Sequence, residues 1–282
     1  MNTGSRFGQS GGETATAVRL KRRRRQAALG LALIALTACG KGRDWRQTQA
    51  TGPAADAEAG YVRPPQILSA ARGPDGVVVL AGRAEPNSRV RLQTPEGAAF
   101  GGTVTAAGDW SMPMPPGTGI YGLSEDLGGR IVQGEGYIVV LPQPGRPAAL
   151  LRAGGGAVTL GSPPGGLSIA AADFDRGGGA VISGFASAGA ALKLVVDGAA
   201  APGEVKADQG GRFFIGSPVM LRPGAHQVRV QGAAQAASAD IAVGPPGPIS
   251  GQPYRAVRQG GAWRVDWTTP GGGVQTSLIL DP

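Results

Sequence analysis

Residues 79–92 read VLAGRAEPNSRVRL, and residues 181–194, which lie 102 positions further on, read VISGFASAGAALKL. Each stretch is a strand-length run rich in Val, Leu or Ile, then a turn of small and polar residues, then a second strand-length run. A second pair of motifs follows, AGDWSM at 107–112 and GGRFFI at 210–215. An internal repeat of this length predicts two copies of one folding unit rather than a solenoid of short repeats.

Short apolar and β-branched runs separated by turn residues continue along the chain from Pro64 onward. Arg89–Leu92 alternates polar and apolar residues, which is the pattern of a strand with one face in water. The 50 glycines and 23 prolines of the 282 residues fall between such runs rather than uniformly, as expected for many short strands joined by tight turns. No segment after residue 63 combines a sustained helical period with caps. The sequence therefore predicts an all-β fold.

Three motifs mark the second unit: Asp197-Gly198, the run Asp208 to Phe213, and the run Leu221 to Val230. In these residues the chain resembles the bacterial Ig-like modules of surface and periplasmic proteins. The first unit lacks the third motif and carries Gly117 to Val140 in its place. The resemblance implies a β-sandwich for each unit, with two sheets, inward-facing alternation and no disulfide.

The predicted organisation is two tandem Ig-like β-sandwiches, at 64–142 and 166–246, with a hairpin or linker between them at 143–165. A C-terminal β-hairpin is predicted at 247–282, because two strand-like runs flank the turn residues 269–273. An isolated hairpin is only marginally stable in water. We therefore expect this hairpin to pack on a module or on the segment between the modules.

The N-terminal residues 1–38 have the pattern of a secretory signal peptide. Basic residues at 21–25 precede an apolar stretch at 27–35, and the run Leu36-Thr37-Ala38-Cys39 closes it. This ending resembles a bacterial lipoprotein signal. The resemblance implies that Cys39, the only cysteine of the chain, is acylated with chains such as palmitate and becomes the mature N-terminus. Gly40 stands where inner-membrane lipoproteins usually have Asp, which implies the outer membrane, facing the periplasm.

The alternatives for this segment are a buried structural cysteine, a membrane span and a twin-arginine export signal. The apolar segment from Ala27 to Ala38 is about a dozen residues, against the roughly 20 that a membrane-spanning helix needs. The arginines also lack the Phe-Leu-Lys type of continuation that twin-arginine signals show. Residues 1–17 are polar and fit poorly before a signal, so translation from Val18 is a further hypothesis. Residues 39–63 are poor in large apolar side chains and are predicted to be a flexible, disordered tether.

The formal net charge of +8 resides mostly in the signal segment. Residues 1–38 hold seven of the 27 basic residues and one of the 19 acidic residues. The remaining chain is therefore close to neutral, with 20 basic and 18 acidic residues. Its basic residues are scattered singly, without the basic stripe and interleaved aromatics of a nucleic-acid site. Nucleic acid is therefore excluded as the expected partner.

The chain has few residues of the types that catalysis or metal binding requires. His226 is the only histidine, and the mature chain has no cysteine other than Cys39, which the resemblance assigns to the lipid anchor. We therefore expect neither a nucleophile–base pair nor a Cys/His zinc site. Residues 173–177 (DFDRG) begin like a calcium loop, but Gly184 stands where the bidentate Glu should be. We interpret them as a strand end and a turn.

Four acidic residues could in principle form a pair for sugar hydrolysis, but nothing in the sequence brings them together: Glu125, Asp126, Asp197 and Asp208. The glycine runs at 154–156, 177–179 and 271–273 lack the Lys-Ser/Thr or helix that phosphate binding needs. The sequence thus predicts a protein that is not an enzyme and that binds no cofactor or metal.

Two tryptophans, Trp263 and Trp267, fall on one face of a predicted strand, alternating with Arg264 and Asp266. They could stack on sugar rings or fill a core. Trp110 aligns with Phe213 of the other unit and is predicted to be core. The expected function is a non-enzymatic, lipid-anchored envelope module that binds or spaces another envelope protein or peptidoglycan. The alternative is carbohydrate or peptidoglycan binding through Trp263 and Trp267.

Overall fold

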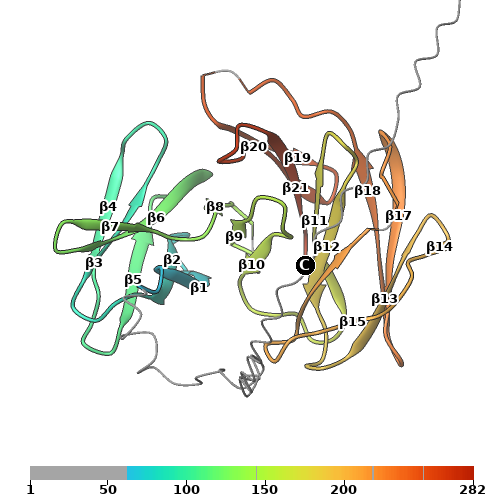
Figure 1. Ribbon diagram of the computed structural model, residues 1–282, viewed down its shortest axis with the longest axis horizontal. Helices are drawn as coiled ribbons and strands as arrows, with labels where there is room; N and C mark the ends of the chain where they lie inside the picture. The colour runs from blue at the N-terminus through green and yellow to red at the C-terminus, as the bar shows by residue number, and fades with distance from the viewer. Residues whose placement is uncertain (1–61, 144, 218, 250) are drawn as a thin grey trace, which may run out of the picture. The chain divides into compact units, whose positions relative to one another are not determined.

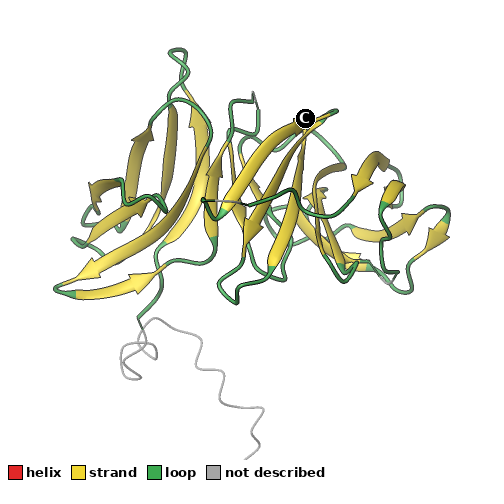
Figure 2. Cartoon of the chain, turned by 90° about the horizontal axis from the view of Figure 1, so that it is seen from above, coloured by secondary structure: helices red, strands yellow, loops and turns green. Residues whose placement is uncertain are grey.

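The computed structural model describes residues 62–282 apart from 144, 218 and 250. The predicted signal peptide, Cys39 and nearly all of the predicted tether lie outside the described residues. Within the described part, all regular structure is β, and strands β1 to β21 form four antiparallel sheets (Figures 1 and 2). The prediction of an all-β fold is confirmed. These residues contain no helix long and apolar enough to span a membrane.

The first two sheets enclose one apolar core. The smaller sheet has the order β1-β2-β5, with bounds Gln66–Arg72, Val78–Arg83 and Asp109–Met114. The larger has the order β10-β9-β8-β6-β3-β4, and β7 pairs with β6. Its strands, in chain order from β3, are Arg89–Gln93, Ala99–Thr103, Gly119–Leu127, Arg130–Gln133, Tyr137–Val140, Ala148–Leu151 and Val158–Leu160.

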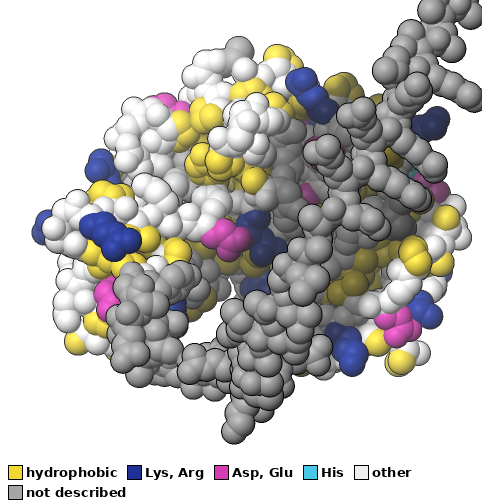
Figure 3. Space-filling model, in the orientation of Figure 1, with side chains coloured by type: hydrophobic (Ala, Val, Ile, Leu, Met, Phe, Trp, Pro, Cys, Tyr) yellow, Lys and Arg dark blue, Asp and Glu magenta, His cyan; other side chains and the backbone are white. Residues whose placement is uncertain are grey.

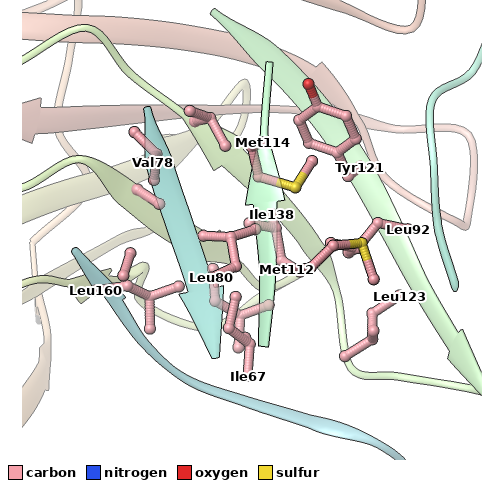
Figure 4. Packing of buried hydrophobic residues seen from close by; sticks show 14 of the residues in the cluster. Ile67, Val78, Leu80, Leu92, Met112, Met114, Tyr121, Leu123, Ile138 and Leu160 are labelled. Atoms are coloured by element: carbon pink, nitrogen blue, oxygen red, sulfur yellow. The ribbon is translucent and has the colours of Figure 1, made fainter. Parts of the chain in front are cut away.

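The core between these sheets is visible in Figure 4. Leu80, Met112 and Met114 of the smaller sheet meet Leu92 and Ile138 of the larger one. The alternation that the sequence shows in β3 is present: Val90 and Leu92 are buried, while Arg89, Arg91 and Gln93 are exposed. Burial of every second residue gives this half of the chain a sandwich structure.

The other two sheets enclose a second core, which includes Ile182, Leu194, Phe213 and Val230. One sheet has the order β16-β12-β11-β21-β20-β19. Its strands in chain order are Ser168–Asp175, Ala180–Phe185, Arg212–Gly216, Tyr254–Gln259, Ala262–Thr268 and Val274–Leu280. The other sheet has the order β14-β13-β17-β18 with β15 on β13, and its strands in chain order are Ala191–Val196, Ala199–Ala200, Val205–Lys206, Gly224–Gln231 and Ala236–Val243.

The segments outside the repeat are built into these sheets. Strands β9 and β10, between the two predicted modules, continue the sheet of β8. Strand β21 pairs with β11 from Ala171 to Asp175, so the C-terminal hairpin packs on a module as predicted. A further strand, β19, pairs with β20. The hairpin is therefore a three-stranded meander, which the hairpin prediction did not include.

A third apolar cluster lies between the outward faces of the second and third sheets. Val139 and Leu151 of β8 and β9 belong to it together with Val265, Trp267 and Ile279 of β20 and β21. Residues Leu151, Val265 and Trp267 have no exposed surface. The C-terminal meander thus completes one sandwich and also contacts the other.

Candidate functional site

Of the acidic residues noted in the sequence, Asp197 contacts His226, whereas Asp126 and Asp208 lie apart, each in its own turn. Asp126 Oδ1 accepts a hydrogen bond from Gly129 N at 2.7 Å, and Asp208 Oδ1 accepts one from Arg212 N at 2.8 Å. Asp126 belongs to β6 in one sandwich, whereas Asp208 precedes β16 in the other. Each carboxylate closes a local turn. Among the residues that the structure describes, no group of three or more His, Cys, Asp or Glu side chains could hold a metal ion.

His226 is engaged through both ring nitrogens. Nε2 lies 2.7 Å from the carbonyl oxygen of Arg222, and Nδ1 lies 2.7 Å from Asp197 Oδ2. The Arg222 carbonyl and the Asp197 carboxylate favour the protonated ring and raise the pKa of His226. The same contact with His226 lowers the pKa of Asp197. The pair ties β17 to the turn after β13, which is a structural role.

Residues 173–177 form the predicted strand end and turn. Strand β11 ends at Asp175, whose Oδ1 accepts a hydrogen bond from Gly179 N at 3.2 Å. Asp173, two residues earlier, is buried. Its carboxylate accepts hydrogen bonds from Ala157 N at 2.7 Å and from the Ser277 hydroxyl. Burial raises the pKa of Asp173 to about 6. Asp173 therefore joins the β9–β10 connection to β11 and β21.

Glu125 is fully buried in β6. Its Oε1 accepts hydrogen bonds from Glu85 N at 2.6 Å and from the Ser88 hydroxyl. These contacts fasten the turn between β2 and β3 to β6. The carboxylate thus has a packing role, separate from the neighbouring Asp126.

The two tryptophans of β20 do not form one exposed aromatic face. Trp267 has no exposed surface, and its indole Nε1 donates to Ser277 Oγ at 3.2 Å. Its ring meets that of Tyr137 edge-on, with the centroids 5.9 Å apart. Trp263 is only half-buried, with the Arg258 guanidinium 5.7 Å from its ring centroid. A sugar platform made of both indoles is therefore not present.

The other face of β20 is also buried, although its residues are charged. Arg264 Nε donates to Asp266 Oδ1 at 3.0 Å, and Arg264 Nη2 donates to the carbonyl oxygens of Gly244 and Pro245 at 3.0 and 2.9 Å. Thr276 Oγ1 donates to Asp266 Oδ1 at 2.6 Å. A buried ion pair is tolerated when its remaining hydrogen-bonding atoms are satisfied. Here the pair anchors the segment that leads into the meander.

A hollow of about 630 Å³ surrounds the exposed part of Trp263. Arg258 and Asp281 stand at it as a doubly hydrogen-bonded pair, with both N–O distances 2.8 Å. Gln143 also lines the hollow and is 4% exposed, and neither atom of its side-chain amide has a hydrogen-bond partner among the described residues. An unpaired buried polar group costs about 1–3 kcal/mol. The presence of an unpaired amide at Gln143 therefore calls for an explanation.

The sequence did not single out Gln143, Arg258 or Asp281. Gln143 lies in a proline-rich turn, Arg258 lies in the unexpected strand β19, and Asp281 is the penultimate residue. The pairing of β19, β20 and β21 brings Arg258 and Asp281 together, and Arg146, three residues after Gln143, donates hydrogen bonds to the carbonyl oxygens of Leu280 and Asp281. Only Trp263 carried a local signal, as one of two tryptophans in an alternating strand.

A second open surface, the β3 groove, covers the outward face of β4, β3, β6 and β7. Arg89 and Arg91 stand along its middle strand, and the groove measures about 510 Å³. Arg91 is the register partner of Gly101 on one side and of Ser124 on the other, so small neighbours leave both sides of it open. Neither guanidinium has a hydrogen bond or ion pair within the described part of the chain. On the face shown in Figure 3, basic and acidic side chains are scattered rather than gathered in one patch.

Comparison with protein-family models finds no match for the chain, and comparison with curated proteins finds none either. Conclusions about function therefore rest on the residues and on the fold.

Proposed function

We propose that this protein is a lipid-anchored, non-enzymatic module of the bacterial cell envelope, in which two Ig-like sandwiches bind or space an envelope partner. The observation that carries the proposal is the signal segment that ends in Leu36-Thr37-Ala38-Cys39. Two or more acyl chains hold a protein on a membrane almost permanently, at about 0.8 kcal/mol per buried CH₂. Gly40 after the cysteine favours the outer membrane and the periplasmic side.

The internal repeat supports the Ig-like assignment. Strand β1 pairs with β2 in the same antiparallel register, with the same shift, as β11 pairs with β12, and the β2–β3 and β12–β13 connections cover the equivalent residues 84–88 and 186–190. The structural roles of Glu125, Asp173 and His226 support a binding or spacer role, because each of these groups is committed to holding strands and turns together.

The β3 groove is the surface that we assign to an envelope partner, either a protein or peptidoglycan. Arg89 and Arg91 are exposed cations without partners in the described chain, next to the exposed apolar side chain of Ile131. Cations beside an apolar side chain on an open sheet face suit an acidic, partly apolar partner.

Metabolic labelling with an alkyne analogue of palmitate tests the anchor. The full chain should incorporate the label and sediment with membranes, whereas Cys39→Ser should lose the label and remain an uncleaved precursor. Labelling of Cys39→Ser, or an unlabelled wild-type protein cleaved before Cys39, would refute the anchor.

Cross-linking in intact envelopes tests the groove. The double variant Arg89→Gln/Arg91→Gln should lose a cross-linked product that the wild type gives. The matched control is Arg229→Gln, an exposed arginine on β17 of the other sandwich, and it should keep the product. Loss of the product in both variants, or in neither, contradicts this assignment.

A further inference from the structure

We propose that the hollow at Trp263 binds one pyranose ring of a neutral sugar. Its residues come from the turn after β8 and from the C-terminal meander, and a volume of about 630 Å³ lies in the range usual for small-ligand sites. The site is distinct from the β3 groove and does not depend on the lipid anchor. Its described lining residues are Pro142, Gln143, Gly145, Arg258, Trp263, Asp281 and Pro282.

Gln143 is the first reason to infer a ligand. Buried amides in native proteins nearly always have hydrogen-bond partners, yet both atoms of this amide are unpaired. The amide has an acceptor oxygen beside a donor nitrogen. Both atoms are covered by the residues around them, so a ligand reaches them when the side chain turns toward the hollow. Two adjacent hydroxyl groups of a pyranose match this arrangement, because each hydroxyl can donate and accept, so one can donate to Oε1 while its neighbour accepts from Nε2.

Trp263 supplies the second part of the site. Trp110 and Trp267 are buried at 3% and 0% exposure, so Trp263 is the tryptophan of the described chain that reaches a hollow. A flat indole with an apolar face and a polar edge suits the C–H face of a sugar ring. The Arg258 guanidinium lies over this indole, 5.7 Å from the ring centroid.

The charges of the residues that line the hollow indicate the chemical class of its ligand. Arg258 is paired with Asp281 through two hydrogen bonds of 2.8 Å, so the two charged side chains of the described lining offset each other. A phosphate or carboxylate ligand would find no unpaired cation among the described side chains of this lining. The Asp281 carboxylate can still accept a hydrogen bond from a hydroxyl group, and the Arg258 guanidinium can donate one. An apolar platform with a few fixed polar groups suits a neutral, hydroxyl-rich ring.

The experiment uses cellotetraose as the probe and the full chain in a zwitterionic detergent, because detergents with sugar headgroups would compete. Binding is measured by saturation-transfer NMR on the sugar and by tryptophan fluorescence, with tetraethylene glycol as a ligand that lacks adjacent hydroxyls. We expect saturation transfer to cellotetraose alone. Gln143→Met, which keeps the side-chain length and removes the amide, should weaken binding at least about tenfold.

Thermal unfolding distinguishes a ligand-binding role of Gln143 from a packing role. If the amide serves the ligand, Gln143→Met should unfold at the same or a higher temperature, because an unpaired buried amide has been removed. Gln227→Met, at an exposed position of β17 outside both the hollow and the β3 groove, is the matched control and should bind as the wild type does. Trp263→Phe keeps an aromatic ring in place and should reduce both the affinity and the fluorescence change.

Three results would overturn the inference: no saturation transfer to cellotetraose at about 10 mM, where even weak sites are populated; equal binding by Gln143→Met and the wild type; or a lower unfolding temperature of Gln143→Met without sugar binding by the wild type. None of these measurements involves Cys39, so their failure leaves the proposed lipid anchor untouched.

Discussion

Gly82 lies directly under the indole of Trp110. The two residues are register partners of β2 and β5, and a Cβ atom on Gly82 would stand 2.7 Å from Cζ2 of the indole. It would also overlap the carbonyl oxygen of Gln66. The ring therefore fills the space that a side chain on Gly82 would need.

The same relationship recurs in the second sandwich, between Gly184 and Phe213 of β12 and β16. A Cβ atom on Gly184 would stand 2.7 Å from Cζ of the ring and would overlap the carbonyl oxygen of Ser168. The preceding strand has its register shift at the equivalent point in both copies, after Ile67 and after Ile169. The glycine, the aromatic ring and the irregular strand thus form one unit of the repeat.

Gly184→Ala should lower the free energy of unfolding by about 3 kcal/mol, since overpacking against a fixed backbone is costly. Urea denaturation of the full chain gives this value. Gly216→Ala on β16 is the matched control, because a Cβ atom there has no neighbour within 4 Å, and its change should stay within about 0.5 kcal/mol. Equal stability of the two variants would contradict this prediction, because it would mean that β11 moves away from the added methyl group at little energetic cost.

The repeat and the alternation in strands such as β3 were sufficient to predict the fold class, because both report directly which residues face a core. The burial of Arg264 and Asp266 was not predictable in this way. Their alternation with Trp263 and Trp267 suggests a strand with one wet face, but the segment at 244–247 covers that face. Such coverage is tertiary and leaves no local pattern.

The candidate site was predictable only in part. Trp263 stood out as an unusual residue in a strand, whereas its companion Trp267 is a core residue. Gln143 and Asp281 are 138 positions apart, and each is unremarkable in its own segment. Their common location depends on how β21 pairs with β11 and how β8 leads into the turn, which neither composition nor periodicity reveals.

His226 should contribute stability that depends on pH. Its folded pKa is raised above 6.5 by the Arg222 carbonyl and by Asp197, so its contribution is complete below pH 6.5 and is lost as the pH rises through the folded pKa. His226→Gln should therefore destabilise most at low pH and least at high pH. Urea denaturation of both proteins between about pH 6 and 9 measures this. A destabilisation that is constant with pH would contradict the Asp197 contact.

Gly40→Asp should shift the protein from the outer to the inner membrane if Cys39 is acylated. The lipoprotein resemblance associates Asp after the cysteine with retention in the inner membrane and other residues with export to the outer membrane. Separation of inner and outer membranes on a sucrose gradient should show the shift, and Gly40→Ser should leave the distribution unchanged. The same membrane for wild type and Gly40→Asp would refute sorting by this position.

Asp173 should make the protein less stable as the pH rises from about 4 to 6. Its folded pKa is raised from 3.8 to about 6 by burial. The folded state therefore binds the proton more tightly than the unfolded state, and its stabilisation is complete below pH 3.8 and is lost as the pH rises through about 6. The difference corresponds to roughly 3 kcal/mol, at 1.36 kcal/mol for each pKa unit.

Asp173→Asn tests this linkage, because asparagine has the shape of the protonated acid and stays neutral. Its carbonyl can accept the hydrogen bond from Ala157 N, and the Ser277 hydroxyl can rotate to accept one from its amide. The decline in stability between about pH 4 and 6 should therefore vanish in this variant and persist in Asp175→Asn, whose carboxylate lies at an exposed turn. Urea denaturation at each pH measures the free energy of unfolding. An unchanged decline in Asp173→Asn would mean that carboxylates other than Asp173 cause the decline.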